Sequence, residues 1–245
     1  MEKSEPLVSI IIPAYNEEHR LSATLDRVAS FVAEQAYPIE VVIVDDGSLD
    51  GTAAIVEQFA QTHPFFHLLR VPHGGKGSAI RAGIGHGKGE YLAISDADLA
   101  VPIEELVRFL PPVLDDYDVA IASREARGAK RFNEPYYRHL MGRVYNLLVR
   151  LLAVPKVQDT QCGFKVFHRE VAHDLFARQT IDGWGIDVEI LFIAQRAGYK
   201  IVEVPVNWYY GKGSKIRPVQ DTLRMIRDLL QVRRNARQGR YDLAA

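Results

Sequence analysis

The sequence predicts an α/β protein with a mostly parallel central sheet and helices on both of its faces. Two observations carry this prediction. Short runs rich in Val and Ile recur through the first half of the chain, and segments with helical spacing of apolar residues separate them. The connections are short, which is typical of β-α-β units arranged in one sheet. We therefore expect a single domain over residues 1–245.

Five strands are expected in the first half of the chain. Residues 7–13 (LVSIIIP) form a short β-branched run, typical of a strand that is buried on both faces. Apolar residues at positions 21, 25, 28, 31 and 32 have helical spacing and predict a helix over 17–35. Further strands are expected at 39–44, 67–71, 91–95 and 119–122, with helices over 52–63, from about 76, and over 103–110.

The pattern loosens after residue 124. A basic loop leads to a long amphipathic helix over about 134–153 and then to a short strand at 164–167. A helix over 186–196, a strand at 201–206 and a final helix over about 219–237 complete the expected elements. We expect the amphipathic helices of the second half of the chain to be additions to the sheet that the first half forms.

Composition excludes several classes of protein. Of the 245 residues, 47% are hydrophobic, which excludes a disordered or fibrous chain. The single cysteine, Cys162, can form neither an internal disulfide nor a Cys/His metal cluster, so a reducing compartment fits best. No signal peptide or transmembrane run is apparent. The formal net charge of -1 hides two basic segments, 124–156 and 211–245, each with a net charge of +6, and a remainder of -13.

A pair of acids follows the strand expected at 91–95. Asp96 and Asp98 flank one small residue. Ligands of open α/β sheets bind at the carboxyl ends of strands, and two carboxylates in an extended turn can hold a hard cation such as Mg²⁺ or Mn²⁺. Alternatively, the pair only caps the helix that begins after Pro102, since Asp is a common capping residue.

Two loops at the same edge add polar groups. Of Asp45 and Asp46, one is expected to accept hydrogen bonds from a nucleobase or ribose, and the other to form a turn and a helix cap. The glycines at 74, 75 and 77, around Lys76, would let a phosphate approach the backbone at the start of a helix.

Four motifs, in this order and spacing, resemble glycosyltransferase family 2, whose fold is GT-A. They are residues 12–18 (IPAYNEE), residues 44–52 (VDDGSLDGT), Lys76-Gly77 followed by Ala79 and Gly83, and Asp96-Ala97-Asp98. The second half resembles the dolichyl-phosphate, or polyprenyl-phosphate, sugar synthases, and is more similar to the β-glucosyltransferases among them than to the mannose synthases. The matching residues are 159–165, 184, 187–189, 203–206 and 213–215. The resemblance extends over about residues 7–235.

The resemblance implies an inverting hexosyltransferase. Glucose would pass from UDP-glucose to a polyprenyl or dolichyl phosphate, with Mg²⁺ or Mn²⁺ as cofactor. Residues 7–123 would bind the nucleotide sugar, and residues 124–245 would face the acceptor and the membrane. Ala100 departs from the mannose synthases, which often have Gln there, and its methyl group cannot coordinate a metal.

The resemblance also implies roles for individual residues. The nucleoside pocket would be lined by Pro13, Tyr15 and Glu17, with backbone contacts around Val44 and a base or ribose contact from Asp46. Lys76 and Ala97 would lie beside the donor, and Asp96 and Asp98 would hold the metal and the diphosphate. The diphosphate and the acceptor phosphate would be faced by Arg124, Lys215 and Arg217.

Asp187 and Glu189 decide between two classes of acceptor. They lie where related transferases with hydroxyl acceptors carry a general base. A lipid phosphate is already anionic and needs no base, so we expect the pair, with Asp187 in the catalytic set beside Asp98, to orient the acceptor end or its basic partners. The alternative is an exposed pair of acids that stabilises a helix N-terminus.

The helix expected over 134–153 is relevant to whether the protein binds a membrane. It has an apolar stripe and a face with recurring cations, as helices that lie in the headgroup region of an anionic membrane do. The alternative is that the stripe packs on the core. The stripe consists of Tyr137, Leu140, Met141, Val144, Leu147, Leu148, Leu151 and Leu152. We expect a cytoplasmic protein attached peripherally to the cytoplasmic face of a membrane, and no nucleic-acid partner.

Three other functions stay open from the sequence. They are a GDP-mannose-dependent polyprenyl-phosphate mannose synthase, a soluble family 2 enzyme with a hydroxyl acceptor, and a nucleotide-binding module without catalysis. The intact acid pair together with Lys215 disfavours the module.

Overall fold

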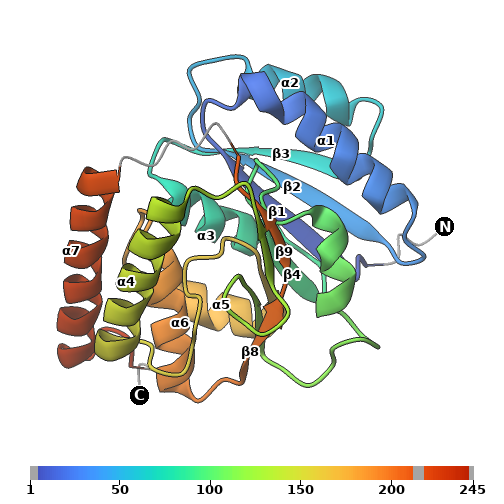
Figure 1. Ribbon diagram of the computed structural model, residues 1–245. Coiled ribbons are helices and arrows are strands. Elements are labelled where there is room, and N and C mark those ends of the chain that lie inside the picture. The colour runs from blue at the N-terminus through green and yellow to red at the C-terminus, as the bar shows by residue number, and fades with distance from the viewer. Residues whose placement is uncertain (1–4, 212–217, 243–245) are drawn as a thin grey trace.

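The computed structural model describes residues 5–211 and 218–242, and over these residues it has the expected α/β architecture (Figure 1). The seven strands of the main sheet are β1 (Val8–Ala14), β2 (Ile39–Asp45), β3 (Phe66–Arg70), β4 (Tyr91–Ile94), β5 (Val119–Ser123), β7 (Lys165–His168) and β8 (Ile201–Pro205). Their order in the sheet is β3-β2-β1-β4-β7-β5-β8. All neighbours are parallel except β7, which is antiparallel to β4 and β5. The sheet is therefore mostly parallel, as predicted.

Helices cover both faces of this sheet. On one face, α1 (Glu18–Ala33), α2 (Thr52–Ala60) and the 3-10 helix η1 (Ile103–Phe109) pack over side chains such as Ile10 and Ile12. On the other, α3 (Lys76–His86), α5 (Arg169–Ala177) and α6 (Ile186–Ala197) pack over side chains such as Ile11 and Val44. Because both faces are covered, the strands can be continuous apolar runs without polar alternation.

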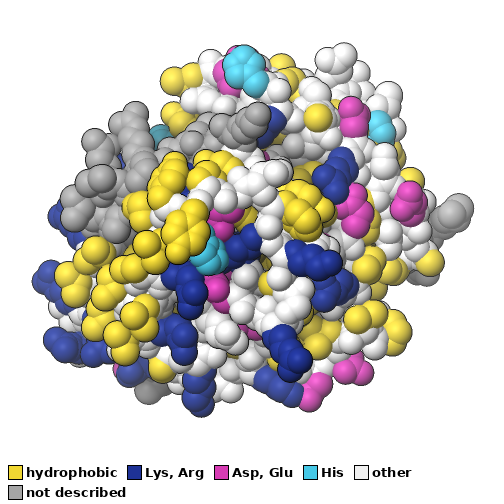
Figure 2. All heavy atoms as spheres, viewed as in Figure 1, with side chains coloured by type: hydrophobic (Ala, Val, Ile, Leu, Met, Phe, Trp, Pro, Cys, Tyr) yellow, Lys and Arg dark blue, Asp and Glu magenta, His cyan; other side chains and the backbone are white. Residues whose placement is uncertain are grey.

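α4 (Tyr136–Leu152) and α7 (Pro218–Arg237) lie side by side at the left of Figure 1. α4 contributes only Tyr145, Asn146 and Val149 to the buried residues. All eight residues of its apolar stripe are exposed, from 36% for Leu148 to 72% for Leu151, and Figure 2 shows apolar side chains gathered over this region. The alternative that the stripe packs on the core is therefore wrong. Among the helices that the structure describes, none combines the length and apolarity needed to cross a bilayer.

Some elements were not expected from the sequence. β6 (Lys130–Phe132) and β9 (Asn207–Tyr209) form a second, two-stranded sheet, in which the rings of Phe132 and Tyr209 stack with centroids 4.5 Å apart. Three residues are too few for a periodic pattern. α5 was also missed, and the segment expected as a helix over 103–110 is the 3-10 helix η1.

Candidate active site

The carboxyl ends of β1, β2 and β4 lie at one edge of the sheet, because these strands are parallel neighbours. The turn after β4 carries Asp96 and Asp98. Its Leu99 has a φ of +46°, a left-handed conformation that is unfavourable for Leu, yet the side chain is buried in the core. The Leu99 N–H donates to the carbonyl of Asp96 at 3.1 Å. Core packing therefore holds this turn in a strained conformation.

Four side chains form a row of alternating charges beside this turn. The Lys76 Nζ atom lies 2.8 Å from Oδ1 of Asp96 and 3.9 Å from Oδ2 of Asp187. Beyond Asp187, the Lys165 Nζ atom donates to Asp187 Oδ1 and to the carbonyl of Cys162, each at 2.5 Å. The row joins the turn after β4 to α3, α6 and β7, so it fixes these elements relative to one another.

Mutual attraction keeps the first pair charged. Burial lowers the pKa of Lys76, but the carboxylates of Asp96 and Asp187 outweigh burial and raise that pKa above its usual value. Burial likewise opposes ionisation of Asp96, yet Lys76 outweighs it and lowers the pKa of that carboxyl. The Lys76 ammonium also lies 5.1 Å from the ring centroid of Trp184, in a cation-π contact.

Gly163 leaves room for the carboxylate of Asp96. A Cβ atom at position 163 would lie 2.0 Å from Asp96 Oδ2 and 2.6 Å from its Cγ. No real side chain fits there without moving Asp96. Gly163, in the segment of residues 159–165 (DTQCGFK), therefore belongs to this site because it has no side chain.

The side chain of Asp98 is as exposed as that of Asp96, at 36%, but its ionic contact is longer. Its Oδ1 accepts the N–H of Ala100 at 3.1 Å, and its Oδ2 lies 4.0 Å from Arg20. Burial, followed by the negative charge of Asp96, raises the pKa of Asp98. A carboxylate next to another carboxylate, with one weak cationic contact, is a suitable ligand for a metal cation.

Asp96 and Asp98 are suitable ligands for Mg²⁺ or Mn²⁺, but they supply only part of a coordination shell. Asp96 and Asp98 supply the hard oxygen ligands that these cations prefer. Among the described residues, however, no group of three His, Cys, Asp or Glu side chains lies close enough to enclose a metal. A cation on Asp96 and Asp98 would therefore complete its shell with diphosphate oxygens and water, as Mg²⁺ commonly does.

The glycine loop before α3 is not a free phosphate cradle. The N–H groups of Gly74 and Gly75 donate to the carboxylate of Asp46 at 2.8 and 3.0 Å, and the Gly77 N–H donates to the carbonyl of Asp182 at 2.7 Å. The close approach that these glycines permit is to residues 181–183, because a Cβ atom at Gly75 or Gly77 would lie 2.7 Å from a carbonyl oxygen there. These N–H groups are engaged within the protein in this structure, and the phosphate contact expected there stays a prediction.

Asp45 and Asp46 have different hydrogen-bond partners within the protein. Asp45 accepts the N–H of Ser48 at 3.0 Å, which forms the expected turn. Asp46 is 3% exposed and holds the glycine loop, and its Oδ2 also contacts His73 Nδ1 at 2.9 Å. The base or ribose contact of Asp46 stays a prediction, and its visible role is to hold the loop before Lys76.

The other residues expected around the nucleoside lie near the ends of β1 and β2. Tyr15 stacks on His73, with ring centroids 4.2 Å apart. The Glu17 carboxylate pairs with Arg20 at 2.7 Å. Pro13 is partly buried, whereas the side chain of Val44 is fully buried under α3, so only its backbone can reach a nucleoside. Ala97 is buried, and its carbonyl accepts the hydroxyl of Thr24 at 2.7 Å.

Arg124 is engaged within the protein. Its guanidinium makes a bidentate pair with the buried Asp159, at 2.7 and 2.8 Å, and lies 5.3 Å from the ring centroid of Trp208. Burial opposes ionisation of Asp159, but Arg124 outweighs burial and lowers the pKa of that carboxyl to about 2. In this conformation Arg124 anchors the end of β5 to the DTQCGFK segment, which does not support the expected phosphate contact.

Asp187 and Glu189 differ although both lie in the first turn of α6. Asp187 is 8% exposed and lies between Lys76 and Lys165. Glu189 is fully buried, and its carboxylate accepts from Thr180 and Ile181 and from the hydroxyl of Tyr241 at 2.7 Å. The alternative of an exposed pair of acids is therefore wrong. Lys215 and Arg217 lie outside the described residues.

Three residues at the site received no role from the sequence. Lys165 lies in an apolar strand, and a lone Lys in such a strand signals a buried partner. His73 precedes the glycines, and Trp184 lies in a Gly-Trp-Gly loop that contacts Lys76. The partners of all three come from distant segments. Only Lys165 could have been recognised from the residues next to it in the sequence.

Comparison with known proteins agrees with this geometry. Residues 9–176 match the family described as glycosyl transferase family 2. The chain is 34% identical over 241 residues to a dolichyl-phosphate β-glucosyltransferase of Trichomonas vaginalis, covering 94% of this chain and 71% of that protein. It is 34% identical over 251 residues to the dolichyl-phosphate β-glucosyltransferase of Homo sapiens, covering 96% of this chain and 78% of that protein.

A solved structure supports the fold. Glucosyl-3-phosphoglycerate synthase of Mycobacterium tuberculosis, in complex with Mn²⁺, UDP and its product, superposes with a TM-score of 0.66 at 21% identity, covering 93% of this chain and 80% of that one. Another structure of that enzyme holds Mg²⁺ and UDP. The matched family, the length of the similarity and the GT-A-like architecture together show that this chain is a glycosyltransferase and belongs to glycosyltransferase family 2.

Proposed function

We propose that this chain transfers glucose from UDP-glucose to dolichyl phosphate or another polyprenyl phosphate, with inversion at the anomeric carbon. The observation that carries the proposal is the similarity to dolichyl-phosphate β-glucosyltransferases, which extends over more than nine tenths of the chain and includes the segments around Gly163 and Asp187. The solved neighbour that holds UDP supports a uridine donor.

The acids at the site support an acceptor that is already anionic. Displacement of a nucleoside diphosphate by a hydroxyl needs a base, whereas a phosphate oxygen needs none. Asp187 lies between two lysines, and the buried carboxylate of Glu189 accepts four hydrogen bonds. We propose that Asp187 positions Lys76 and Lys165 and removes no proton from the acceptor.

Charge on the leaving diphosphate is the main electrostatic demand of the reaction. We propose that Asp96 and Asp98 hold Mg²⁺ or Mn²⁺, which when bound would neutralise the diphosphate as a Lewis acid. Lys76, 2.8 Å from Asp96, supplies a fixed positive charge at the same place. Since Gly163 and Lys76 hold the Asp96 carboxylate on two sides, the site is organised before substrates arrive.

The exposed stripe of α4 provides a means of reaching a lipid acceptor. We propose that it lies in the interface of a membrane, so that the chain is attached peripherally to the membrane that holds the polyprenyl phosphate. Its apolar residues are exposed and cations recur along the same helix, at Arg138, Arg143 and Arg150.

A lipid-extraction assay tests the proposed reaction. Radiolabelled UDP-glucose is incubated with the protein, Mn²⁺ and polyprenyl phosphate in detergent, and the organic phase is counted. Label in the organic phase that requires polyprenyl phosphate supports the proposal. Label only in a water-soluble product, or a stronger signal from GDP-mannose, would contradict the acceptor or the donor, respectively.

The metal is tested separately by thermal stabilisation. UDP with Mn²⁺ is expected to raise the melting temperature of the wild type more than either alone, and Asp98→Ala is expected to abolish the part that depends on Mn²⁺. Full metal-dependent stabilisation of Asp98→Ala would show that the metal is held elsewhere.

A further inference from the structure

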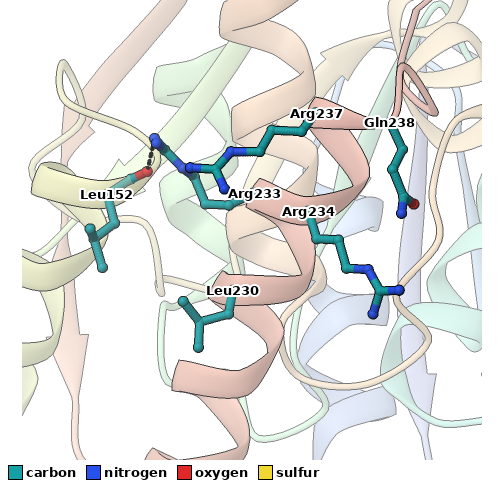
Figure 3. Close-up of a pocket in the computed structure, with 6 residues that line it drawn as sticks. All are labelled: Leu152, Leu230, Arg233, Arg234, Arg237 and Gln238. Atoms are coloured by element: carbon teal, nitrogen blue, oxygen red, sulfur yellow. Dashed lines mark hydrogen bonds between the residues drawn. The ribbon is translucent and has the colours of Figure 1, made fainter.

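A cationic hollow lies between the C-terminal ends of α4 and α7, apart from the residues described above (Figure 3). It has a volume of about 380 Å³ and is lined by Leu152, Leu230, Arg233, Arg234, Arg237 and Gln238. The α7 residues among them recur at positions 230, 233, 234 and 237, the spacing that places side chains on neighbouring parts of one helix surface. None of the described residues that line the hollow is acidic.

The three guanidinium groups differ in what they contact. Arg233 donates to the carbonyl of Leu152 at 2.6 Å, which satisfies a backbone acceptor at the end of α4. Figure 3 shows Arg237 extending from α7 in the same direction as Arg233, whereas Arg234 extends from the helix on another side. Among the side chains that the structure describes, neither Arg234 nor Arg237 has an ion-pair partner.

The helix dipole explains only part of this arrangement. Cations in the last turn of a helix stabilise it, and Arg234 and Arg237 lie in the last turn of α7. A cation at any position around the last turn, including one exposed to water, would stabilise the helix in this way. The helix dipole does not account for a hollow that is lined by three arginines beside exposed leucines, with Arg233 and Arg237 extending in the same direction.

The leucines connect the hollow to the stripe of α4. Leu152 ends that stripe and is 39% exposed, and Leu230 of α7 is 60% exposed. An apolar surface therefore leads from α4 into the hollow, with cations where the apolar surface ends. Figure 2 shows this combination, with Lys and Arg side chains along the border of the apolar region at its lower left.

We propose that this hollow binds the phosphate headgroup of an anionic phospholipid while the stripe of α4 lies in the same bilayer leaflet. The inference goes beyond the proposed function, because it concerns a lipid that is not the acceptor and residues that are not part of the site around Asp96. It assigns Arg237 and Arg234 to the headgroup and Leu152 and Leu230 to the acyl chains next to it.

The chemistry of the groups matches this ligand. Guanidinium groups bind phosphate oxygens through paired hydrogen bonds, and their long stems can lie along apolar surface while the charge stays at headgroup level. Each cation near an anionic surface strengthens binding by about fivefold. Removing two should therefore weaken partitioning by about thirtyfold.

Vesicle co-sedimentation tests the proposal. The full chain is mixed with vesicles of phosphatidylcholine alone, or of phosphatidylcholine with one fifth phosphatidylglycerol. The vesicles contain no polyprenyl phosphate, so the result does not depend on the proposed acceptor. The variants are Arg237→Gln, Arg234→Gln/Arg237→Gln and, as a control with the same loss of charge, Lys88→Gln/Lys200→Gln, at two exposed positions.

The expected results separate the hollow from a general effect of charge. The wild type should bind the phosphatidylglycerol vesicles, the Arg234→Gln/Arg237→Gln variant about thirtyfold more weakly, and the control within about twofold of the wild type. An equal loss in the control would overturn the proposal in favour of net charge alone, and no loss in the arginine variants would overturn it outright.

Two further measurements complete the test. Inorganic phosphate, at an ionic strength matched with chloride, should not release the wild type from vesicles, and release would assign the hollow to a soluble phosphate. Transfer to a polyprenyl phosphate in detergent should be unchanged in Arg234→Gln/Arg237→Gln. A loss of transfer at an unchanged melting temperature would place these residues in the acceptor site and overturn the separate role.

Discussion

Gly163 lies so close to Asp96 that a Cβ atom at position 163 would be 2.0 Å from the carboxylate oxygen Oδ2. The contact joins the segment before β7 to the turn after β4, two neighbouring strands that are antiparallel. Since Asp96 is also paired with Lys76 at 2.8 Å, its carboxylate is held between Gly163 and the ammonium group of Lys76. Its position is therefore sensitive to a single methyl group.

Gly163→Ala is expected to lower kcat by about a hundredfold, because displacement of a catalytic group by about 1 Å has that order of effect. The same variant should bind Mn²⁺ more weakly in the presence of UDP. Steady-state transfer and a metal titration measure the two effects.

Gly142→Ala is the matched control for that substitution. Gly142 lies in α4, and a Cβ atom there would meet nothing within 4 Å. Its variant should keep wild-type kcat and gain up to about 1 kcal/mol of stability from the better helix former. Wild-type activity in Gly163→Ala would show that Asp96 can move without consequence.

Asp187→Asn tests whether the reaction uses a base. Because Asp187 positions lysines and takes no proton in our proposal, the variant should lose part of its rate while its pH-rate profile keeps its acidic limb. Its stability should fall by about 3 kcal/mol, since Lys165 would lose its charged partner in a buried site. Urea unfolding and kcat from pH 5 to 9 provide the measurements.

Asp182→Asn provides the comparison. Asp182 lies in the neighbouring loop, and its carboxylate makes a surface pair with Arg81 at 3.2 Å. Little change is expected in rate or stability. Loss of the acidic limb in Asp187→Asn, but not in Asp182→Asn, would identify Asp187 as a base and favour a hydroxyl acceptor.

The pair of Arg124 and Asp159 predicts how stability depends on pH. The pKa of Asp159 is about 2 in the folded protein, below its ordinary value of 3.8. A lowered folded-state pKa contributes stability that is complete above the unfolded-state pKa and is lost as the pH falls through the folded-state pKa. The contribution, about 2 kcal/mol, should therefore be present at pH 7 and disappear between about pH 4 and pH 2.

Urea unfolding of the wild type and of Asp159→Asn between pH 7 and pH 2 measures this contribution. The wild type should be more stable by about 3 kcal/mol at pH 7, since the variant leaves Arg124 buried without a charged partner. The difference should narrow below pH 4. Asp116→Asn, at an exposed pair with Lys200, should show only a small difference throughout. A difference for Asp159→Asn that stayed constant down to pH 2 would contradict the linkage.

The sequence predicted the main sheet because apolar runs covered on both faces have a strong local signal. It also predicted that Asp96 and Asp98 would follow β4 at the ligand-binding edge. It did not predict that Arg124 is paired with Asp159, or that Gly75 and Gly77 approach residues 181–183. These contacts join segments 35 to about 105 residues apart, and the same residue types would serve equally well to bind a phosphate.

A buried network links the C-terminal end of the described chain to the loop beside Lys76. Tyr241 is 1% exposed, and its hydroxyl donates to Glu189 at 2.7 Å. Glu189 also accepts the Ile181 N–H at 2.9 Å, and the next residue, Asp182, accepts the Gly77 N–H at 2.7 Å. Three hydrogen bonds thus connect Tyr241 to the residue that follows Lys76.

Tyr241→Phe should therefore affect both stability and the donor site. Loss of a hydrogen bond to a buried carboxylate is expected to reduce the free energy of unfolding by about 2 kcal/mol. Because Glu189 then holds residues 180–182 less firmly, kcat/KM for the sugar donor should fall by about tenfold at a temperature where the variant is fully folded. Tyr199→Phe, which removes a hydroxyl that donates to Asp174 at 2.9 Å, should lower stability without changing kcat/KM. Equal kinetic effects in the two variants would show that the network has no specific connection to the donor site, whereas an effect confined to Tyr241→Phe makes Tyr241 a positioning residue for Lys76.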